Sequence, residues 1–256
     1  MDNQKYYKSY DYDSLNKLAL SSKTKKILEL IPDDVKSIMD IGCGNGLITN
    51  ELAKKYSVTG IDRNKKALEF VKTKTILAKA DNIPVEDNSY DMVFSSELLE
   101  HLEEAAFYRA AGEMARISRR YIFVTVPNRE NLKKTMVQCP GCKFIYNRSY
   151  HVRSFNFADI EKLFSGCQMI QRLEYGKQIR MYSNVILKIK QKISPPISWI
   201  PYYWTKKNHR KTTCPKCGHK FSYEYKFSIL SFACDMINIL ILPKKPYWMF
   251  VLLKKI

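Results

Sequence analysis

The chain has 256 residues, which is long enough for one well-packed α/β domain with insertions. Its net charge of +18 lies in the second half. Residues 1–126 hold 19 basic and 19 acidic side chains, whereas residues 127–226 hold 20 basic and 5 acidic ones. The sequence has no uninterrupted run of about 18 apolar residues, so a transmembrane helix is not expected. The start, Met1–Tyr6, lacks the apolar core of a signal peptide, and the expected location is the cytoplasm, free or peripheral to a membrane.

The first chemical signal lies in residues 37–46, Ser-Ile-Met-Asp-Ile-Gly-Cys-Gly-Asn-Gly. This pattern predicts a short strand, a glycine-rich turn and then a helix over residues 47–55. Glycine allows a tight turn and close approach of a ligand to the main chain, and a helix start offers free N–H groups. The spacing differs from the dinucleotide fingerprint Gly-x-Gly-x-x-Gly. A carboxylate at Asp40 would repel a pyrophosphate but could pair with a cationic amino group.

Further strands and helices follow in an alternating order. Asp62 ends the second strand and comes 22 residues after Asp40, near the roughly 20-residue spacing at which a carboxylate receives ribose hydroxyls. The predicted elements are a strand at Val58–Asp62, a strand end at Ala78–Asn82, a strand at Tyr90–Ser96, a helix opening at Leu98–Leu102, a strand at Tyr121–Val126, a helix at Phe157–Ser165, and strands at Gln168–Tyr175 and Tyr247–Lys254.

The motif from Asp40 to Gly46, together with these strand ends, resembles class I S-adenosylmethionine-dependent methyltransferases of types 11 and 23. The resemblance covers about residues 35–180 and returns in the last ten residues. It implies a doubly wound, seven-stranded Rossmann-like α/β sheet in which the seventh strand returns antiparallel between the fifth and sixth. Matched position by position, it implies that S-adenosylmethionine is bound by Asp40, Gly42, Cys43, Gly44, Gly46, Asp62, Arg63, Asp81, Asn82 and Ser95.

Four of the seven cysteines form two matching knuckles, Cys139-Pro-Gly-Cys142 and Cys214-Pro-Lys-Cys217. Two Cys-x-x-Cys knuckles can complete a four-sulfur zinc site, and the alternatives are disulfides or redox dithiols. Four thiolates leave no open position for water or substrate, so the expected zinc is structural. Cys167 and Cys234 stand in apolar surroundings and are expected to be core residues.

Seventy-one residues separate the two knuckles, far more than in a simple zinc ribbon. In the implied topology, however, the connections after the fifth and sixth strands leave the same sheet edge, which also holds the ligands. We therefore expect a methyltransferase core at residues 1–180, completed by residues 246–256. The insertions at 139–152 and 190–245 are expected to bind one zinc ion between them and to form a lid over the substrate site.

His101 and His151 are the candidate general bases, because histidine titrates near neutral pH. A packing role in the helix after the fourth strand is the alternative for His101. A structural role is the alternative for His151, which begins a His-Val-Arg-Ser-Phe stretch after the first knuckle.

The basic second half suggests an anionic partner. Residues 195–211 combine aromatic and basic side chains, which suit single-stranded RNA, a membrane surface or the wall of a sugar or nucleotide pocket. The tyrosine-rich stretch Tyr6–Tyr12 is either a segment that folds over the cofactor or a surface helix.

The expected function is methylation, on oxygen, of a small or medium-sized anionic acceptor such as a saccharide or metabolite. An RNA methyltransferase and a zinc-ribbon binding module on a degenerate methyltransferase scaffold are the alternatives. The acceptor, the methylated atom and the oligomeric state cannot be derived from the sequence.

Overall fold

The computed structural model describes residues 17–201, 204–205 and 210–256. The predicted segment Tyr6–Tyr12 lies outside them. The chain divides into two compact units. The sheet unit comprises residues 17–128, 155–176 and 248–256, and the cysteine unit comprises the described residues of 129–154 and 177–247. The predicted boundaries of the core and its insertions stay a prediction.

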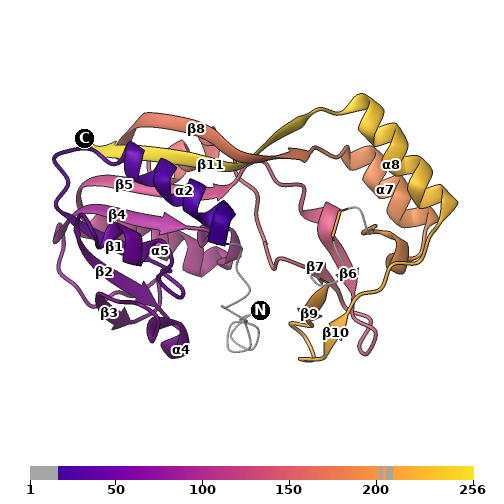
Figure 1. Cartoon of the computed structure of the whole chain (residues 1–256), viewed down its shortest axis with the longest axis horizontal. Helices are drawn as coiled ribbons and strands as arrows, with labels where there is room; N and C mark the ends of the chain where they lie inside the picture. The colour runs from indigo at the N-terminus through magenta and orange to yellow at the C-terminus, as the bar shows by residue number, and fades with distance from the viewer. Residues whose placement is uncertain (1–16, 202–203, 206–209) are drawn as a thin grey trace. The chain divides into compact units, whose positions relative to one another are not determined.

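The sheet unit is built on seven strands in the order β3-β2-β1-β4-β5-β11-β8 (Figure 1). Strands β3, β2, β1, β4 and β5 pair in parallel, and β11 pairs antiparallel with β5. The predicted Rossmann-like sheet, with its last strand returning antiparallel beside the fifth, is therefore confirmed. The strands are β1 Ser37–Ile41, β2 Ser57–Asp62, β3 Lys74–Leu77, β4 Tyr90–Ser96, β5 Ser118–Pro127, β8 Cys167–Arg180 and β11 Lys244–Lys255.

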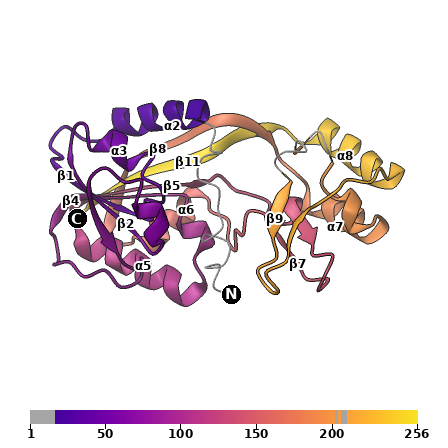
Figure 2. The same ribbon diagram turned by 60° about the horizontal axis from the view of Figure 1, so that its bottom comes forward.

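Helices cover both faces of this sheet, with α2 on one side and α5 on the other (Figure 2). The side chains of each strand alternate between two cores, as the pleat of a β-strand requires. In β11, Met249 and Val251 join the core beneath α5, whereas Phe250 joins the core beneath α2. The helical elements are α2 Lys17–Leu30, α3 Thr49–Leu52, α4 Lys65–Leu68, the 3-10 helix η2 Leu99–His101, α5 Glu104–Ile117 and α6 Phe157–Leu163.

Two predicted helices differ from the structure at their ends. The helix expected over residues 47–55 is confined to α3. After it, the N–H groups of Lys54 and Lys55 donate to carbonyls three residues earlier, those of Glu51 and Leu52, as in a turn. The helix expected to open at Leu98 begins as a 3-10 turn. Leu102 and Glu103 then adopt extended ψ angles of 135° and 159°, so the α-helix starts only at Glu104.

The described residues of the cysteine unit form two short hairpins, two α-helices and two 3-10 helices. The hairpins are β6–β7 and β9–β10, each holding one Cys-x-x-Cys knuckle between its strands. Helix α8 follows the second hairpin in the chain. The elements are η3 Leu132–Thr135, β6 Met136–Gln138, β7 Ile145–Asn147, α7 Asn184–Ile193, η4 Pro196–Ser198, β9 Lys211–Thr213, β10 Lys220–Ser222 and α8 Ile229–Ile241.

The aromatic and basic segment 195–211 is described in part, since residues 202–203 and 206–209 fall outside the described set. Trp199 is buried, and its indole Nε1 donates a hydrogen bond to the carbonyl of Ser194 at 3.1 Å. Trp204 packs edge-on against Tyr182. In the described part of this segment, both tryptophans therefore pack inside the cysteine unit. No helix among the described residues combines the length and the apolar character needed to cross a membrane.

Candidate functional site

The glycine turn follows β1 directly and is held at the end of β2. The N–H groups of Gly42 and Cys43 both donate to the carbonyl of Ile61, at 2.8 and 2.9 Å. Gly42, Gly44 and Gly46 have φ angles of 78°, 54° and 72°, which residues with a side chain rarely adopt. A Cβ at Gly46 would lie 2.9 Å from the side chain of Val71. The turn therefore requires glycine and presents bare main chain at the carboxyl edge of the sheet.

Hydrogen bonds to Asp62 connect the glycine turn to the end of β2. Its carboxylate accepts hydrogen bonds from the N–H of Gly44 at 2.9 Å and of Asn64 at 2.8 Å. Burial raises the pKa of Asp62, and the two backbone donors act in the opposite direction. A carboxylate fixed in this way at the end of the second strand is placed as a receptor of ribose hydroxyls needs to be.

Asp40 is a buried carboxyl beneath the turn. Its Oδ2 accepts a hydrogen bond from Thr49 Oγ1 at 2.7 Å. Burial raises the pKa of Asp40 to about 7, and the negative charge of Asp62 adds to this shift. A bound cation beside Asp40 would counteract both effects, because opposite charge favours the ionised form. The pairing of Asp40 with an ammonium group stays a prediction.

The other predicted cofactor residues lie at the ends of neighbouring strands. Ser95, in β4, is buried and its Oγ donates to the carbonyl of Ile41 at 2.8 Å. Asp81, after β3, forms an ion pair with Arg109 of α5 at 2.7 Å. Burial raises the pKa of the Cys43 thiol. The side chains of Arg63 and Asn82 are exposed to solvent. The sheet topology brings all ten residues to one edge, and their roles in binding stay a prediction.

A buried lysine at this edge was missed by the sequence analysis. Lys23 of α2 is 1% exposed, and its Nζ donates to Ser96 Oγ at 2.9 Å and to Glu97 Oε1 at 3.1 Å. The ammonium group also lies 4.7 Å from the ring centroid of Trp248. Three lysines stand within four residues of this helix, and nothing in the local pattern marks Lys23 as the buried one. It places a cation at the carboxyl end of β4.

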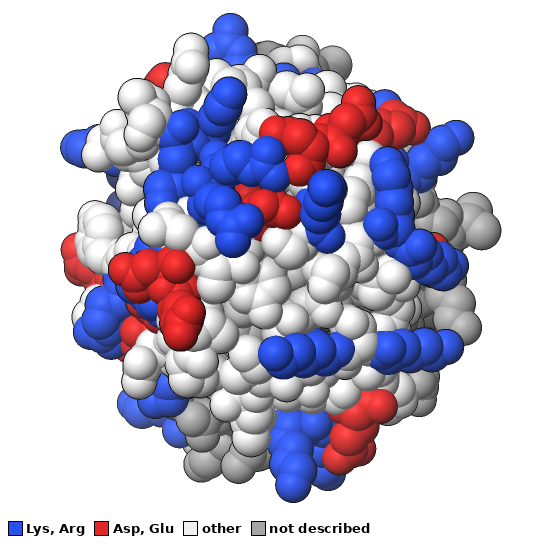
Figure 3. Space-filling view, turned by 90° about the vertical axis from the view of Figure 1, so that its left-hand side faces the viewer, with Lys and Arg blue, Asp and Glu red and all other residues white. Residues whose placement is uncertain are grey.

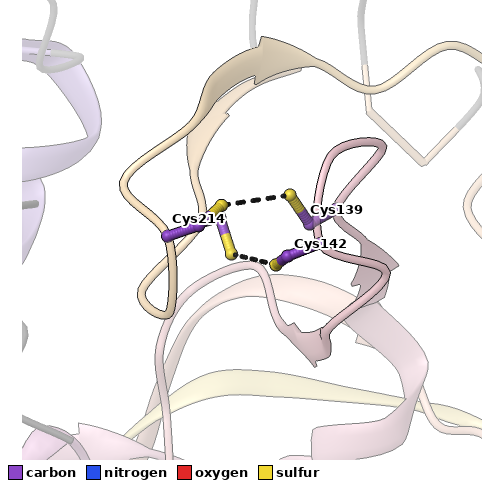
Figure 4. Close-up of side chains that lie close together, drawn as sticks. Cys139, Cys142 and Cys214 are labelled. Atoms are coloured by element: carbon purple, nitrogen blue, oxygen red, sulfur yellow. Dashed lines mark hydrogen bonds between the residues drawn. The ribbon is translucent and has the colours of Figure 1, made fainter.

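In the cysteine unit, the two knuckles bring their four thiols together (Figure 4). The Sγ atoms of Cys139 and Cys217 are 3.7 Å apart, and those of Cys142 and Cys214 are 3.5 Å apart. A tetrahedral ion with Zn–S bonds of about 2.3 Å holds its sulfurs roughly 3.8 Å apart, whereas a disulfide bond is about 2.05 Å long. The four sulfurs therefore fit a metal ion, and the predicted meeting of distant knuckles is observed.

Both knuckles have the same backbone design. In the first, the N–H of Cys139 donates to the carbonyl of Phe144, and in the second the N–H of Cys214 donates to the carbonyl of His219. The residue after the second cysteine is left-handed in each, with φ of 61° at Lys143 and 76° at Gly218. Such repetition indicates two copies of one Cys-x-x-Cys turn.

Comparison with known proteins agrees with the geometry of the sheet unit. Residues 39–121 match the family model described as "Methyltransferase domain". These residues are a methyltransferase domain. The match begins in β1 and ends in β5, so it includes the glycine turn and the edge formed by Asp40 and Asp62.

Several curated proteins are similar to part of the chain. The chain is 30% identical over 122 residues to the ubiquinone biosynthesis O-methyltransferase of Bordetella parapertussis, covering 43% of this chain and 50% of that protein. It is 29% identical over 175 residues to an uncharacterised protein of Methanocaldococcus jannaschii, covering 65% of this chain and 67% of that one. The chain spans about half the length of the curated O-methyltransferases it matches.

Solved structures share the fold at low identity. A SAM-dependent methyltransferase from Archaeoglobus fulgidus superposes with a TM-score of 0.58 at 14% identity, covering 94% of this chain and 95% of that one. A SAM-dependent methyltransferase from Methanosarcina mazei gives a TM-score of 0.52 at 15% identity, covering 90% and 97%. These likenesses support the methyltransferase fold of the sheet.

The two predicted bases belong to different units. His101 ends η2, beyond the methyltransferase strand β4, and is partly buried. His151 is buried in the cysteine unit, and its Nδ1 contacts the carboxylate of Glu130. Glu130 was missed by the sequence analysis, because 20 intervening residues separate it from His151 and no periodic pattern connects them. A carboxylate on Nδ1 fixes the imidazole orientation and the tautomer.

Proposed function

We propose that this protein transfers a methyl group from S-adenosylmethionine to an oxygen atom of a small or medium-sized anionic acceptor, a saccharide or metabolite. The observation that carries the proposal is the methyltransferase edge, with three left-handed glycines and the Asp62 carboxylate on the N–H of Gly44. Oxygen as the acceptor atom is favoured by the relatives named as O-methyltransferases. An anionic acceptor is favoured by the charge of residues 127–226, 20 basic against 5 acidic.

Each residue at the edge has a distinct task in binding the cofactor. The bare main chain of Gly42–Gly46 accommodates the close approach of the ligand, and Asp62 receives the ribose hydroxyls. Asp40 would pair with the ammonium group of the cofactor, and Asp81 with Asn82 would contact its adenine. The cofactor supplies a methyl group already activated on a sulfonium, so the protein aligns the acceptor and removes its proton.

His151 is the proposed base for that proton. Its Nδ1 contacts Glu130, and with the ring proton held on Nδ1, the lone pair lies on Nε2. Glu130 also stabilises the imidazolium that forms after proton transfer, as a carboxylate does for a catalytic histidine. His101 is the alternative base on the sheet unit.

The four cysteines are proposed to hold a structural zinc ion. Sulfur spacings of 3.5 and 3.7 Å match a tetrahedral site. A backbone hydrogen bond from Phe144 lowers the pKa of Cys142 to about 7, whereas burial raises the pKa of Cys214 to about 12. A bound cation would favour the thiolate form of both groups. Cys139 and Cys214 are buried among Val137, Tyr146 and Tyr150, so the ion would stabilise the core of the cysteine unit. Whether the unit also covers the substrate site, as the lid hypothesis states, stays a prediction.

The first experiment is calorimetric titration of the metal-loaded protein with S-adenosylmethionine. Asp62→Ala is expected to weaken binding by at least about tenfold, the scale on which a lost charge-assisted hydrogen bond acts. The matched control is Asp33→Ala, which removes an exposed carboxylate. Absence of binding by the folded parent protein would contradict the methyltransferase proposal. Equal binding by the parent and Asp62→Ala would contradict the role assigned to Asp62.

The second experiment follows transfer of a labelled methyl group to anionic sugars, nucleotide-linked sugars and RNA. His151→Ala is expected to lower kcat while leaving the Kd for S-adenosylmethionine unchanged, and Glu130→Gln is expected to lower kcat less. Loss of cofactor binding in His151→Ala would show a structural role instead. Labelling of RNA, with an affinity that falls steeply with salt, would replace the small-acceptor proposal.

A further inference from the structure

Helices α7 and α8 lie side by side in the cysteine unit (Figures 1 and 2). A surface helix normally buries its apolar face and exposes its polar one. Helix α8 does the reverse. The buried positions of α8 are Ser231, Cys234, Asp235 and Asn238, and its exposed positions are Ile229, Leu230, Ala233, Ile237, Leu240 and Ile241.

The interior between the helices is held by polar contacts. Lys190 of α7 and Asp235 of α8 form a fully buried ion pair at 2.6 Å, and the hydroxyl of Tyr182 donates to the same carboxylate oxygen at 2.8 Å. Asn238 accepts from the N–H of Ser183 and donates to the carbonyl of Met181, both at 2.9 Å. These groups satisfy one another inside the unit, which leaves the apolar side chains to face outward.

The exposed apolar side chains of each helix lie on one side of that helix. Leu240 is 85% exposed and Ile229 is 67% exposed, whereas large exposed apolar patches are rare on soluble surfaces without a binding role. On α7, Val185, Ile189 and Ile193 recur every four residues and therefore share one side of the helix. The apolar face is defined as Val185, Ile189, Ile193, Ile229, Leu230, Ile237, Leu240 and Ile241.

Lysines border the apolar face. Lys188 and Lys192 are exposed on α7 and follow Val185 and Ile189 at a spacing of three residues. Lys226 precedes α8 and Lys244 follows it, and both are exposed. In the sequences of the two helices, which are described in full, Asp235 is the single acidic residue, and it is neutralised by Lys190. Residues 177–247 contain 14 basic and 2 acidic residues.

We propose that the apolar face of α7 and α8 inserts into the surface of an anionic phospholipid membrane. An apolar face bordered by lysines is the signature of a helix that lies at the boundary between headgroups and acyl chains. Each lysine near an anionic surface adds favourable electrostatic energy. Helix α8 has 13 residues, about 20 Å at 1.5 Å per residue, which is shorter than the bilayer core of about 30 Å. The helix pair therefore lies in the plane of the membrane surface.

A second copy of the chain is the competing occupant of the apolar face. Pairing two such faces would bring Lys188 and Lys192 of one copy near the same lysines of the other, and like charges at short distance repel. An anionic lipid surface offers the opposite charge. The inference concerns where the protein binds and does not depend on the methyl acceptor.

The test is flotation of the full-length, metal-loaded protein with vesicles of phosphatidylcholine alone or containing about one third phosphatidylglycerol. The parent protein is expected to float with the anionic vesicles. The double variant Ile237→Ser/Leu240→Ser is expected to lower the partition coefficient by about tenfold or more, since binding scales with buried apolar area. Ile170→Ser, at an exposed apolar position in β8 of the sheet unit, is the matched control and should bind as the parent does.

A second double variant tests whether the positive charge of the bordering lysines contributes to membrane binding. Lys188→Gln/Lys192→Gln is expected to weaken binding to anionic vesicles by about tenfold or more and to reduce its salt dependence.

Melting temperature and S-adenosylmethionine affinity should stay unchanged in both double variants, because the replaced side chains are exposed. Failure of the parent to float, or equal flotation of parent and Ile237→Ser/Leu240→Ser, would overturn the proposal. A parent dimer that becomes monomeric in Ile237→Ser/Leu240→Ser, without vesicle binding, would overturn it in favour of self-association.

Discussion

At the scale of single residues, the carboxyl edge of the methyltransferase sheet is dominated by buried charge. Asp40 lies beneath the glycine turn, with a pKa of about 7 because of burial. Lys23 is buried beside Glu97 at the end of β4. Buried charges cost stability unless they are paired, and such groups concentrate where a protein binds charged ligands. The burial of these groups at the edge is therefore expected to lower the stability of the sheet unit, as the proposed ligand site would require.

Because burial of the ionised Asp40 carboxylate costs stability, the effect of Asp40→Asn on stability is expected to depend on pH. The folded-state pKa of about 7 lies above the ordinary value of about 3.9. Between these values the folded protein retains a proton that the unfolded chain has lost, so this contribution to stability decreases as pH rises. The asparagine side chain carries no charge, and its carbonyl oxygen can still accept from Thr49. The variant should be more stable than the parent by ~2–4 kcal/mol at pH 8 and by much less near pH 4.

Urea unfolding of the cofactor-free protein at pH 4.5 and 8 measures this difference. Asp33→Asn is the control, since Asp33 is exposed and should change little at either pH. A stability difference that is equal at the two pH values would contradict the raised pKa of Asp40. In the same variant, S-adenosylmethionine should bind more weakly at pH 8, because the partner of its ammonium group is lost.

At the scale of secondary structure elements, the knuckles depend on one left-handed residue each. Gly218 occupies this position in the second knuckle and Lys143 in the first, with φ of 76° and 61°. A Cβ at Gly218 would meet no atom within 4 Å, so a substitution there changes backbone strain without a steric clash. The left-handed conformation costs about 1–2 kcal/mol for a residue with a side chain.

Two opposite substitutions are therefore expected to have opposite effects. Gly218→Ala should destabilise the metal-loaded protein by about 1 kcal/mol, after allowing for the lower entropy of the unfolded alanine chain. Lys143→Gly should leave stability unchanged or raise it by up to ~1 kcal/mol. Thermal or denaturant unfolding of the metal-loaded variants measures both. A neutral effect of Gly218→Ala would show that the second knuckle does not depend on this conformation.

At the scale of the whole molecule, the two units differ in core and in charge. The sheet unit has two large cores, one on each face of the sheet. Acidic and basic side chains intermingle on the face of this unit seen in Figure 3. This agrees with the equal numbers of basic and acidic residues in residues 1–126. The cysteine unit has one small core that includes Cys139 and Cys214 and lies in the strongly basic part of the chain. A small core of this kind commonly needs a metal or disulfide for stability.

Removal of the proposed zinc ion is accordingly expected to affect the two units differently. Chelation should unfold the cysteine unit or lower its melting temperature strongly, because the binding energy of a structural metal contributes to folding. The sheet unit should retain its transition and its affinity for S-adenosylmethionine. Calorimetry with and without the cofactor identifies this transition, since a ligand raises the melting temperature of the unit that binds it. Loss of cofactor binding after chelation would contradict this independence.

The sequence alone determined the features that depend on near neighbours in the chain. The glycine turn at Gly42–Gly46, the strand ends at Asp62 and Ser95–Ser96, and the two Cys-x-x-Cys knuckles all follow from local rules. Turn conformation requires glycine, and a strand pattern repeats every two residues. With the resemblance to methyltransferases, these local signals were sufficient to predict a Rossmann-like sheet whose last strand lies antiparallel between the fifth and sixth.

The tertiary structure decided what depends on partners distant in sequence. Burial of Lys23 beside Glu97, the contact of Glu130 with His151, and the outward apolar face of α8 were not predictable from local patterns. An apolar helix such as α8 has the same sequence signature whether it is buried or lies on a surface. Its orientation depends on Lys190, which comes from another helix and pairs with Asp235. Burial and pairing are properties of the folded chain, because they depend on which distant segments the topology brings together.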